Sequence, residues 1–336
     1  MKTCIICFSD SGAMLAFMLK QVLENAEVHS TEKFASKYGF ISHVSLHSDM
    51  DSLFHSHDAL IFISACGIAV RLIAPFVKDK TKDPAVIVMD DRGRFVIPVL
   101  SGHIGGANAL AERIAELIGS VPVITTATDG AGKFSCDAWA VQHGCAISSM
   151  KTAKDISAAI LTEDIPVSSE FELPDVLPNG LIASDEGELG IYIGIHKNTP
   201  YMSTLRLVPR IVTLGIGCRR DMSSDAIIDA VSRTFAEHNI DIKSISSLAS
   251  VDVKKDEKGL LECAEELGAA PVFYTAAELE ALKGNFEESE FVKKTVGIGN
   301  VCERAAAMTG GELIIRKTAC DGVTVAAAVQ SWRIEF

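Results

Sequence analysis

The chain lacks the features that mark membrane, secreted and nucleic-acid-binding proteins. No window in its 336 residues approaches the roughly 18 consecutive apolar residues of a membrane span. The apolar run after Met1 is short and is followed at once by Ser9 and Asp10, which does not predict a signal peptide. The formal net charge is −13, whereas a nucleic-acid binder would carry a basic face. We therefore expect a cytoplasmic protein that binds neither nucleic acid nor a membrane.

Several catalytic signatures are also missing. The sequence holds no G-x-S-x-G and no H-E-x-x-H motif, so neither a serine hydrolase of that type nor a zincin is predicted. It holds no Walker loop and no G-x-G-x-x-G, so no nucleotide is implied. Cys4 and Cys7 form a C-x-x-C, but a strand would point them to opposite faces, and no second pair follows at zinc spacing. The sequence therefore predicts no metal site, and the nine scattered cysteines indicate free thiols.

What the sequence does contain is a strand-then-helix pattern in its first part. The run ALIFISA at 59–65 is continuously apolar, as expected of a strand buried on both faces of a parallel sheet. Hairpin-turn residues at 90–93 separate two further apolar runs. We expect strands at 2–9, 59–65, 85–89, 94–100 and 121–124, the last of them buried, and helices at 11–24, 68–74, 107–118 and 137–142.

The second half of the chain changes in texture and then returns to the same pattern. Four prolines and short strand-like runs occupy 151–201. After these, strands are expected at 211–217, 245–253 and 271–274, and helices from Ser223 or Ser224 to 235 and at 257–267. We predict an α/β protein: an N-terminal domain with a mainly parallel sheet at 1–140, a small middle α/β domain or connector at 141–207, and a C-terminal α/β domain with a mixed sheet at 208–336.

A glycine-rich turn at 101–106 (SGHIGG) lies between an expected strand and a strong helix. Such a turn exposes backbone N–H groups at the positive end of a helix dipole, which suits an anion. The alternative is that its glycines only permit a tight turn. His103 lies inside it and can exchange a proton near neutral pH, or it can simply cap the helix. Asp129, in a hydroxyl-rich loop after the next strand, could orient His103, bind a substrate or cap its own helix.

Two further turns join glycine to basic residues. Arg71 follows the turn from Ser64 to Gly67 and opens a stretch with several lysines and arginines. Gly217 is followed by the pair Arg219 and Arg220. Such cations could receive carboxylates, although a solvated loop of mixed charge explains most of the lysines better. The residues alone therefore indicate an α/β protein with an anion-receptive site.

Longer stretches resemble a known family. Residues 63–129 (ISACGIAVRLIAPF through VPVITTATD) closely resemble the N-terminal region of the CbiG family of anaerobic cobalamin biosynthesis. LGIGCRRDMSSDAI at 214–227 and LASVDVKKDEKGLLECAEELG at 248–268 resemble the C-terminal domain of that family. The resemblance covers most of the chain in the order of the family, with a variable middle.

The resemblance implies hydrolysis of the δ-lactone of cobalt-precorrin-5A, loss of acetaldehyde and formation of cobalt-precorrin-5B. No cofactor is expected, because the cobalt belongs to the substrate. On this basis we expect His103 as general base, Asp129 as its catalytic partner and the 102–106 amides as oxyanion donors. The expected substrate-binding residues are Ser64, Gly67, Arg71, Ser101, Gly102, Gly105, Gly106, Asn108, Thr125, Thr126, Gly217, Arg219 and Arg220.

Two rival functions share these turns. One is a non-catalytic tetrapyrrole carrier or a scaffold for neighbouring pathway enzymes. The other is an unrelated α/β enzyme that holds a phosphorylated substrate at 102–106, against which the missing nucleotide motifs count. The sequence leaves open a homodimer and transient contacts with the neighbouring enzymes.

Overall fold

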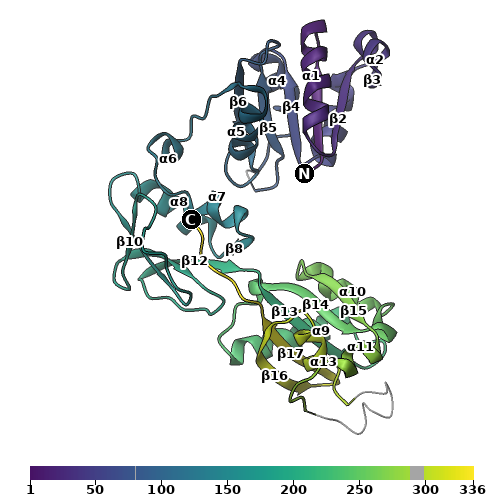
Figure 1. Cartoon of the computed structure of the whole chain (residues 1–336), viewed down its shortest axis with the longest axis vertical. Helices are drawn as coiled ribbons and strands as arrows, with labels where there is room; N and C mark the ends of the chain where they lie inside the picture. Colours follow the sequence, from purple (N-terminus) through teal and green to yellow (C-terminus); the bar gives the residue numbers. More distant parts are fainter. Residues whose placement is uncertain (80, 288–298) are drawn as a thin grey trace. The chain divides into compact units, whose positions relative to one another are not determined.

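The computed structural model describes residues 1–79, 81–287 and 299–336. Its chain divides into two compact units, Met1–Val141 and Gln142–Phe336 (Figure 1). None of the helices in the described part of the chain combines the length and apolar character that a bilayer crossing requires. The expected α/β class is confirmed in both units.

The first unit is built on a seven-stranded sheet of order β3-β2-β1-β4-β5-β6-β7. All neighbours are parallel except β5 and β6, which form the hairpin that the sequence predicts at 90–93. The strands are β1 (Thr3–Cys7), β2 (Ala26–Thr31), β3 (Ile41–His43), β4 (Ala59–Ile63), β5 (Ala85–Met89), β6 (Phe95–Leu100) and β7 (Val121–Pro122). The helices are α1 (Asp10–Val22), α2 (Glu32–Tyr38), α3 (Leu46–Ser56), α4 (Cys66–Ile73), α5 (Ala107–Ile118), α6 (Ala127–Gly130) and α7 (Cys136–Gln142).

Helices cover both faces of this sheet, which explains its continuous apolar strands. On one face, α1 and α5 pack on side chains such as Ile5 and Ile61. On the other face, α3 and α4 pack on their strand neighbours, such as Ile6 and Phe62. Because successive side chains in a strand alternate between faces, each central strand must be apolar throughout. The three layers are therefore helix, sheet and helix.

One strand was predicted wrongly. The run at 121–124 was expected to be buried, but β7 has only two residues and Val121 is 55% exposed. Its position explains this, because β7 lies at the edge of the sheet, with β6 as its neighbour.

The second unit holds two five-stranded sheets. The middle sheet has the order β10-β9-β11-β12-β8 and is accompanied by α8 (Met150–Ala159). Its strands are β8 (Cys145–Ile147), β9 (Ile165–Ser169), β10 (Leu181–Ala183), β11 (Leu189–Ile193) and β12 (Ser203–Pro209).

The C-terminal sheet has the order β15-β14-β13-β17-β16 and is mixed, because β17 runs antiparallel to both of its neighbours. Its strands are β13 (Val212–Cys218), β14 (Ile245–Val251), β15 (Ala270–Tyr274), β16 (Glu312–Cys320) and β17 (Val323–Val329). The helices are α9 (Ser224–Glu237), α10 (Lys258–Glu266), α11 (Ala276–Ala281) and α13 (Cys302–Ala307), with short 3₁₀ turns at Ile242–Ser244 (η1) and Asp252–Lys254 (η2). The sequence-based cap is confirmed, since Ser223 Oγ accepts a hydrogen bond from the Ala226 amide.

Polar contacts join the middle sheet to the η1 turn of the C-terminal part. Arg206 in β12 forms an ion pair of 2.5 Å with the buried carboxylate of Asp241. Lys243 Nζ donates a hydrogen bond to the Ile147 carbonyl in β8. These contacts lie within the second compact unit, which holds both sheets. The finer boundary at 207/208 stays a prediction.

The C-terminal sheet offers a test of its packing at Gly215 in β13. A methyl group there would lie 1.9 Å from the carbonyl oxygen of Cys302, which belongs to the helix α13 on that face. We expect Gly215→Ala to lower the free energy of unfolding by at least ~2 kcal/mol, because backbone would have to shift. Gly130→Ala is the control, since its methyl group would meet nothing within 4 Å. Equal unfolding midpoints in urea for the two variants would contradict the close packing of α13 on β13.

Candidate functional site

The turn after β6 brings His103 to a cluster of polar side chains in the first unit. Ser101 ends the strand with a φ of +56°, a left-handed conformation that is strained for a non-glycine residue. Its hydroxyl donates a hydrogen bond to the Asp83 carbonyl, and its own carbonyl accepts one from the Ala107 amide. These bonds fold the turn back on the start of α5. Residue 103 is thereby held at the tip of a short closed loop.

The glycines of the turn have steric reasons to be there. A methyl group on Gly105 would lie 2.3 Å from Ser101 Cβ, and one on Gly102 would lie 2.8 Å from Asn108 Oδ1. Gly106, the N-cap of α5, has a φ of +81°. The tight turn therefore requires these glycines, and its backbone amides can also receive an anion.

The amides of the turn differ in their availability. The Gly106 amide donates to the His103 carbonyl, so it is already used. The amides of His103, Ile104 and Gly105 donate to no other group among the residues that the structure describes. These three consecutive N–H groups, like the Gly102 amide before them, could bind an oxyanion.

His103 lies between two carboxylates. Its Nε2 is 2.9 Å from Asp129 Oδ2, and its Nδ1 is 3.1 Å from Asp137 Oδ1. The side chain of Asp137 is 8% exposed and that of Asp129 is 32% exposed, so one carboxylate is interior and the other faces solvent. The hydrogen bond with Asp137, opposed by burial and assisted by Asp129, raises the pKa of His103 to about 9. The ring is therefore an imidazolium at neutral pH.

Further hydrogen bonds from neighbouring residues hold both carboxylates in place. Ser135 Oγ donates to Asp137 Oδ1 at 2.8 Å, and the Ala138 amide donates to the same oxygen. Asn108 Nδ2 donates to Asp129 Oδ2 at 2.8 Å, and Thr126 Oγ1 donates to this oxygen as well. The other oxygen of Asp129, Oδ1, accepts no hydrogen bond within the described residues. It is the unengaged proton acceptor of the cluster.

The structure brings together one part of the predicted site. His103, Asp129, Asn108 and Thr126 contact one another, and Ser101, Gly102, Gly105 and Gly106 shape the turn that carries His103. Thr125 is exposed next to Thr126. Ser135 and Asp137 were missed. The only sequence signal was their spacing before an expected helix, where a serine and an aspartate usually cap.

A second part of the predicted site lies on the same sheet, but at the opposite ends of its parallel strands. Ser64, Gly67 and Arg71 follow the carboxyl end of β4. Since β6 runs antiparallel to β5, with Leu100 beside Val86, the turn at 101–106 lies at the amino end of the parallel strands. The two ends of a five-residue strand are roughly 15 Å apart, and this length separates the two turns. Arg71 donates to the Gly67 carbonyl and is otherwise exposed.

The third part belongs to the second unit. Gly217 is the penultimate residue of β13, and a methyl group on it would lie 2.6 Å from Thr324 Oγ1. The exposed Arg219 and Arg220 follow it, and the Arg219 amide donates to the Gly322 carbonyl. The predicted binding roles of Gly217 and these two arginines stay predictions.

Comparison with known proteins identifies two matching families. "Cobalamin synthesis G N-terminal" matches residues 49–129, and "Cobalamin synthesis G C-terminus" matches residues 212–328. The first match contains the His103–Asp129 pair and ends at Asp129, before Ser135 and Asp137.

Curated relatives match along almost the whole chain. A protein of Salmonella typhimurium named cobalt-precorrin-5A hydrolase is 34% identical, with 97% of both chains covered. One of Priestia megaterium with the same name is 30% identical, covering 97% of this chain and 94% of its own. A probable cobalt-precorrin-5A hydrolase of Methanocaldococcus jannaschii is 29% identical over 81% of this chain and 85% of its own.

The carboxylates around His103 predict a pH-dependent stability. The pKa of His103 is about 9 in the folded protein against 6.5 for the free side chain, so its stabilising effect is complete below about pH 6.5. It is then lost as the pH rises from 6.5 through 9. We expect wild type to lose on the order of 2 kcal/mol more than His103→Gln over this interval. Parallel stability curves for the two proteins, from urea unfolding at pH 6 to 10, would contradict the ion pairing.

Proposed function

Because this chain belongs to the CbiG family of cobalamin synthesis proteins, we propose that it is a cobalt-precorrin-5A hydrolase and that the His103 cluster performs the proton transfers. The observation that carries the assignment of the site is the pairing of one imidazolium with an exposed carboxylate beside three available amides. Hydrolysis of a lactone needs a proton acceptor, a proton donor and oxyanion donors. The cluster supplies all three.

The first step is attack of water on the lactone carbonyl. Asp129 accepts the proton of the water at Oδ1, the oxygen to which none of the described residues donates a hydrogen bond. The carbonyl oxygen gains negative charge as the tetrahedral intermediate forms. The amides of His103, Ile104 and Gly105 donate hydrogen bonds to it.

The second step is collapse of that intermediate, in which the bond to the ring oxygen of the lactone breaks. The leaving alkoxide needs a proton, and His103 already holds one at Nε2 toward Asp129. Once Asp129 is protonated, its attraction for the imidazolium falls and that proton becomes available to the alkoxide. We therefore assign His103 as general acid, in place of the general base expected from the sequence. The reason is that both ring nitrogens lie against carboxylates.

Loss of acetaldehyde completes the proposal. The freed alcohol loses its proton, its C–O bond becomes the carbonyl of acetaldehyde, and the neighbouring C–C bond breaks. The electron pair of that bond passes into the corrinoid ring, and the carbon left behind takes up a proton. The electron-poor cobalt macrocycle of the substrate accepts these electrons, so no cofactor of the protein is needed. The candidates to bind substrate carboxylates are Arg71, Arg219 and Arg220. Arg71 lies at the carboxyl end of the parallel strands, whereas His103 lies at their amino end.

The decisive test is acetaldehyde release from cobalt-precorrin-5A by the purified chain alone. We expect turnover by wild type and a loss of at least ~10²-fold in kcat for both His103→Gln and Asp129→Asn, because each removes one proton-transfer group. His47→Gln is the matched control, since His47 is an exposed histidine of α3 away from this cluster, and its rate should equal that of wild type.

Two results would overturn parts of the proposal. Binding of the corrinoid without acetaldehyde release by wild type would identify a carrier or scaffold. Rates near wild type in a folded His103→Gln variant would remove the catalytic role of the cluster while leaving the activity in place.

A further inference from the structure

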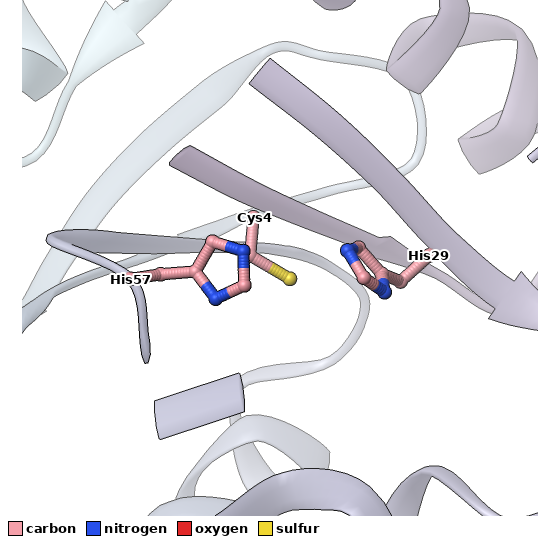
Figure 2. A group of neighbouring side chains, drawn as sticks. All are labelled: Cys4, His29 and His57. Carbon is pink, nitrogen blue, oxygen red and sulfur yellow. The ribbon is translucent and has the colours of Figure 1, made fainter. Parts of the chain in front are cut away.

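A second group of histidines lies in the first unit, away from the residues assigned to hydrolysis. Cys4 in β1, His29 in β2 and His57 just after α3 are all buried, and each offers a ligand atom within 4.8 Å of the others. Figure 2 shows the Cys4 sulfur between the two imidazole rings. The carboxylate of Glu27 lies beside them, with Oε2 at 3.6 Å from His29 Nε2 and 3.5 Å from His57 Nε2.

The register of the sheet explains why these side chains meet. Cys4 pairs with Glu27 and Ile6 pairs with His29 across the parallel strands β1 and β2. Alternation places Cys4, Glu27 and His29 on one face of the sheet, the face covered by α3. His57 directly follows α3, the helix that covers this face, and reaches the group from the helix side. Cys7 packs on the opposite face, so the C-x-x-C pair is divided between the two cores.

The hydrogen bonds of His29 fix which of its nitrogens carries a proton. His43 Nδ1 lies 2.6 Å from the Asp49 carboxylate, which can only accept, so this nitrogen donates. In a neutral His43, Nε2 must then accept, and its partner at 2.8 Å is His29 Nδ1. His29 Nδ1 is therefore the donor, and its Nε2 presents a lone pair. This Nε2 is buried and has no hydrogen-bond partner among the described residues.

His57 faces the same carboxylate. Its Nδ1 donates to the Leu53 carbonyl at 3.0 Å, and its Nε2 makes a long contact of 3.5 Å with Glu27 Oε2. The lone pair of His29 Nε2, the Nε2 of His57 and the Glu27 carboxylate thus converge beside a thiol. The His29 lone pair and the carboxylate repel one another at this range unless a cation lies between them.

The spacing of these atoms fits a metal ion better than it fits an ion pair. A charge-assisted hydrogen bond from imidazolium to carboxylate measures roughly 2.7–2.9 Å, shorter than the 3.5 and 3.6 Å found for Glu27. The ligands of a tetrahedral zinc ion, with bonds of roughly 2.0–2.3 Å, stand roughly 3.3–3.8 Å from one another. The contacts of Glu27 already lie in that interval. The Cys4 sulfur lies within 4.8 Å of a ring nitrogen of each histidine.

We propose that Cys4, His29 and His57, with Glu27 as the fourth ligand, bind a divalent transition-metal ion of the zinc class. One thiolate, two imidazoles and one carboxylate form a ligand set that zinc accepts in four-coordinate sites. Metal-binding histidines are usually oriented by hydrogen bonds from their second ring nitrogen. Here His29 bonds to His43, which bonds to Asp49, and His57 bonds to the Leu53 carbonyl. The metal would tie β1 and β2 to the end of α3, a structural role distinct from the proton transfers at His103.

The test uses tag-free, full-length protein freed of metal by a chelator and then titrated with Zn²⁺ or Co²⁺ alone. We expect one ion per chain, a higher melting temperature with Zn²⁺, and a thiolate-to-cobalt charge-transfer band with Co²⁺. Cys4→Ala should lose the charge-transfer band, and His29→Ala should weaken binding by at least ~10-fold. Cys7→Ala is the matched control, because it removes a buried thiol from the same strand on the other face, and it should bind like wild type.

A measurement on wild type alone guards against variants that do not fold. X-ray absorption of the zinc-loaded protein should show one sulfur at about 2.3 Å together with lighter ligands at about 2.0 Å. A shell of nitrogen and oxygen only would overturn the site. So would the lack of stoichiometric binding at micromolar Zn²⁺, or equal binding by Cys4→Ala and wild type.

Discussion

The burial of the central strands on both faces is the constraint on which the first unit depends. In β1, Ile5 and Cys7 enter the core under α1 and α5, whereas Cys4 and Ile6 enter the core under α3 and α4. Every change of one residue in register would exchange these faces. The constraint makes the strands apolar, and it also makes each polar residue on them costly unless it has partners. Cys4, His29 and Glu27 occupy such positions, and their meeting on one face is a consequence of that register.

The reversal of direction between β5 and β6 decides where the candidate catalytic turn lies. If β6 had continued the parallel order, the turn at 101–106 would share an edge with the turn after β4, and Arg71 would lie near His103. The hairpin at 90–93 sends β6 back instead, so its carboxyl end meets the amino ends of β4 and β5. The following strand β7 is parallel to β6, and this places the Thr126–Asp129 segment beside His103. The predicted hairpin already implies this position of the turn. The position follows once the direction of each strand is used to decide at which end of the parallel strands the following turn lies.

Much of the fold could be predicted because it depends on local signals. Continuous apolar runs marked β4 and β5, the residues at 90–93 marked the hairpin, and Ser223 marked the start of α9. The short edge strand β7 was harder, since its apolar residues resemble those of a buried strand and only its place in the sheet exposes them. For the site, proximity in sequence predicted the turn around His103, and the next strand end predicted Asp129. Asp137 and the Cys4–His29–His57 group could not be found this way, because each depends on contacts between separate elements.

The protonation state of His103 shows why residue type does not determine a catalytic role. A histidine in a glycine turn suggests a base, because its usual pKa lies near neutral pH. Asp137 changes this, because it is interior, is held by Ser135 and the Ala138 amide, and lies 3.1 Å from the ring. The ring therefore carries a proton at neutral pH, and in the mechanism that we propose the exposed carboxylate of Asp129 is the acceptor of the pair. In that proposal, the acid and the base are distinguished by which carboxylate is buried. This difference arises from the packing of α6 and α7 and has no counterpart in the SGHIGG segment itself.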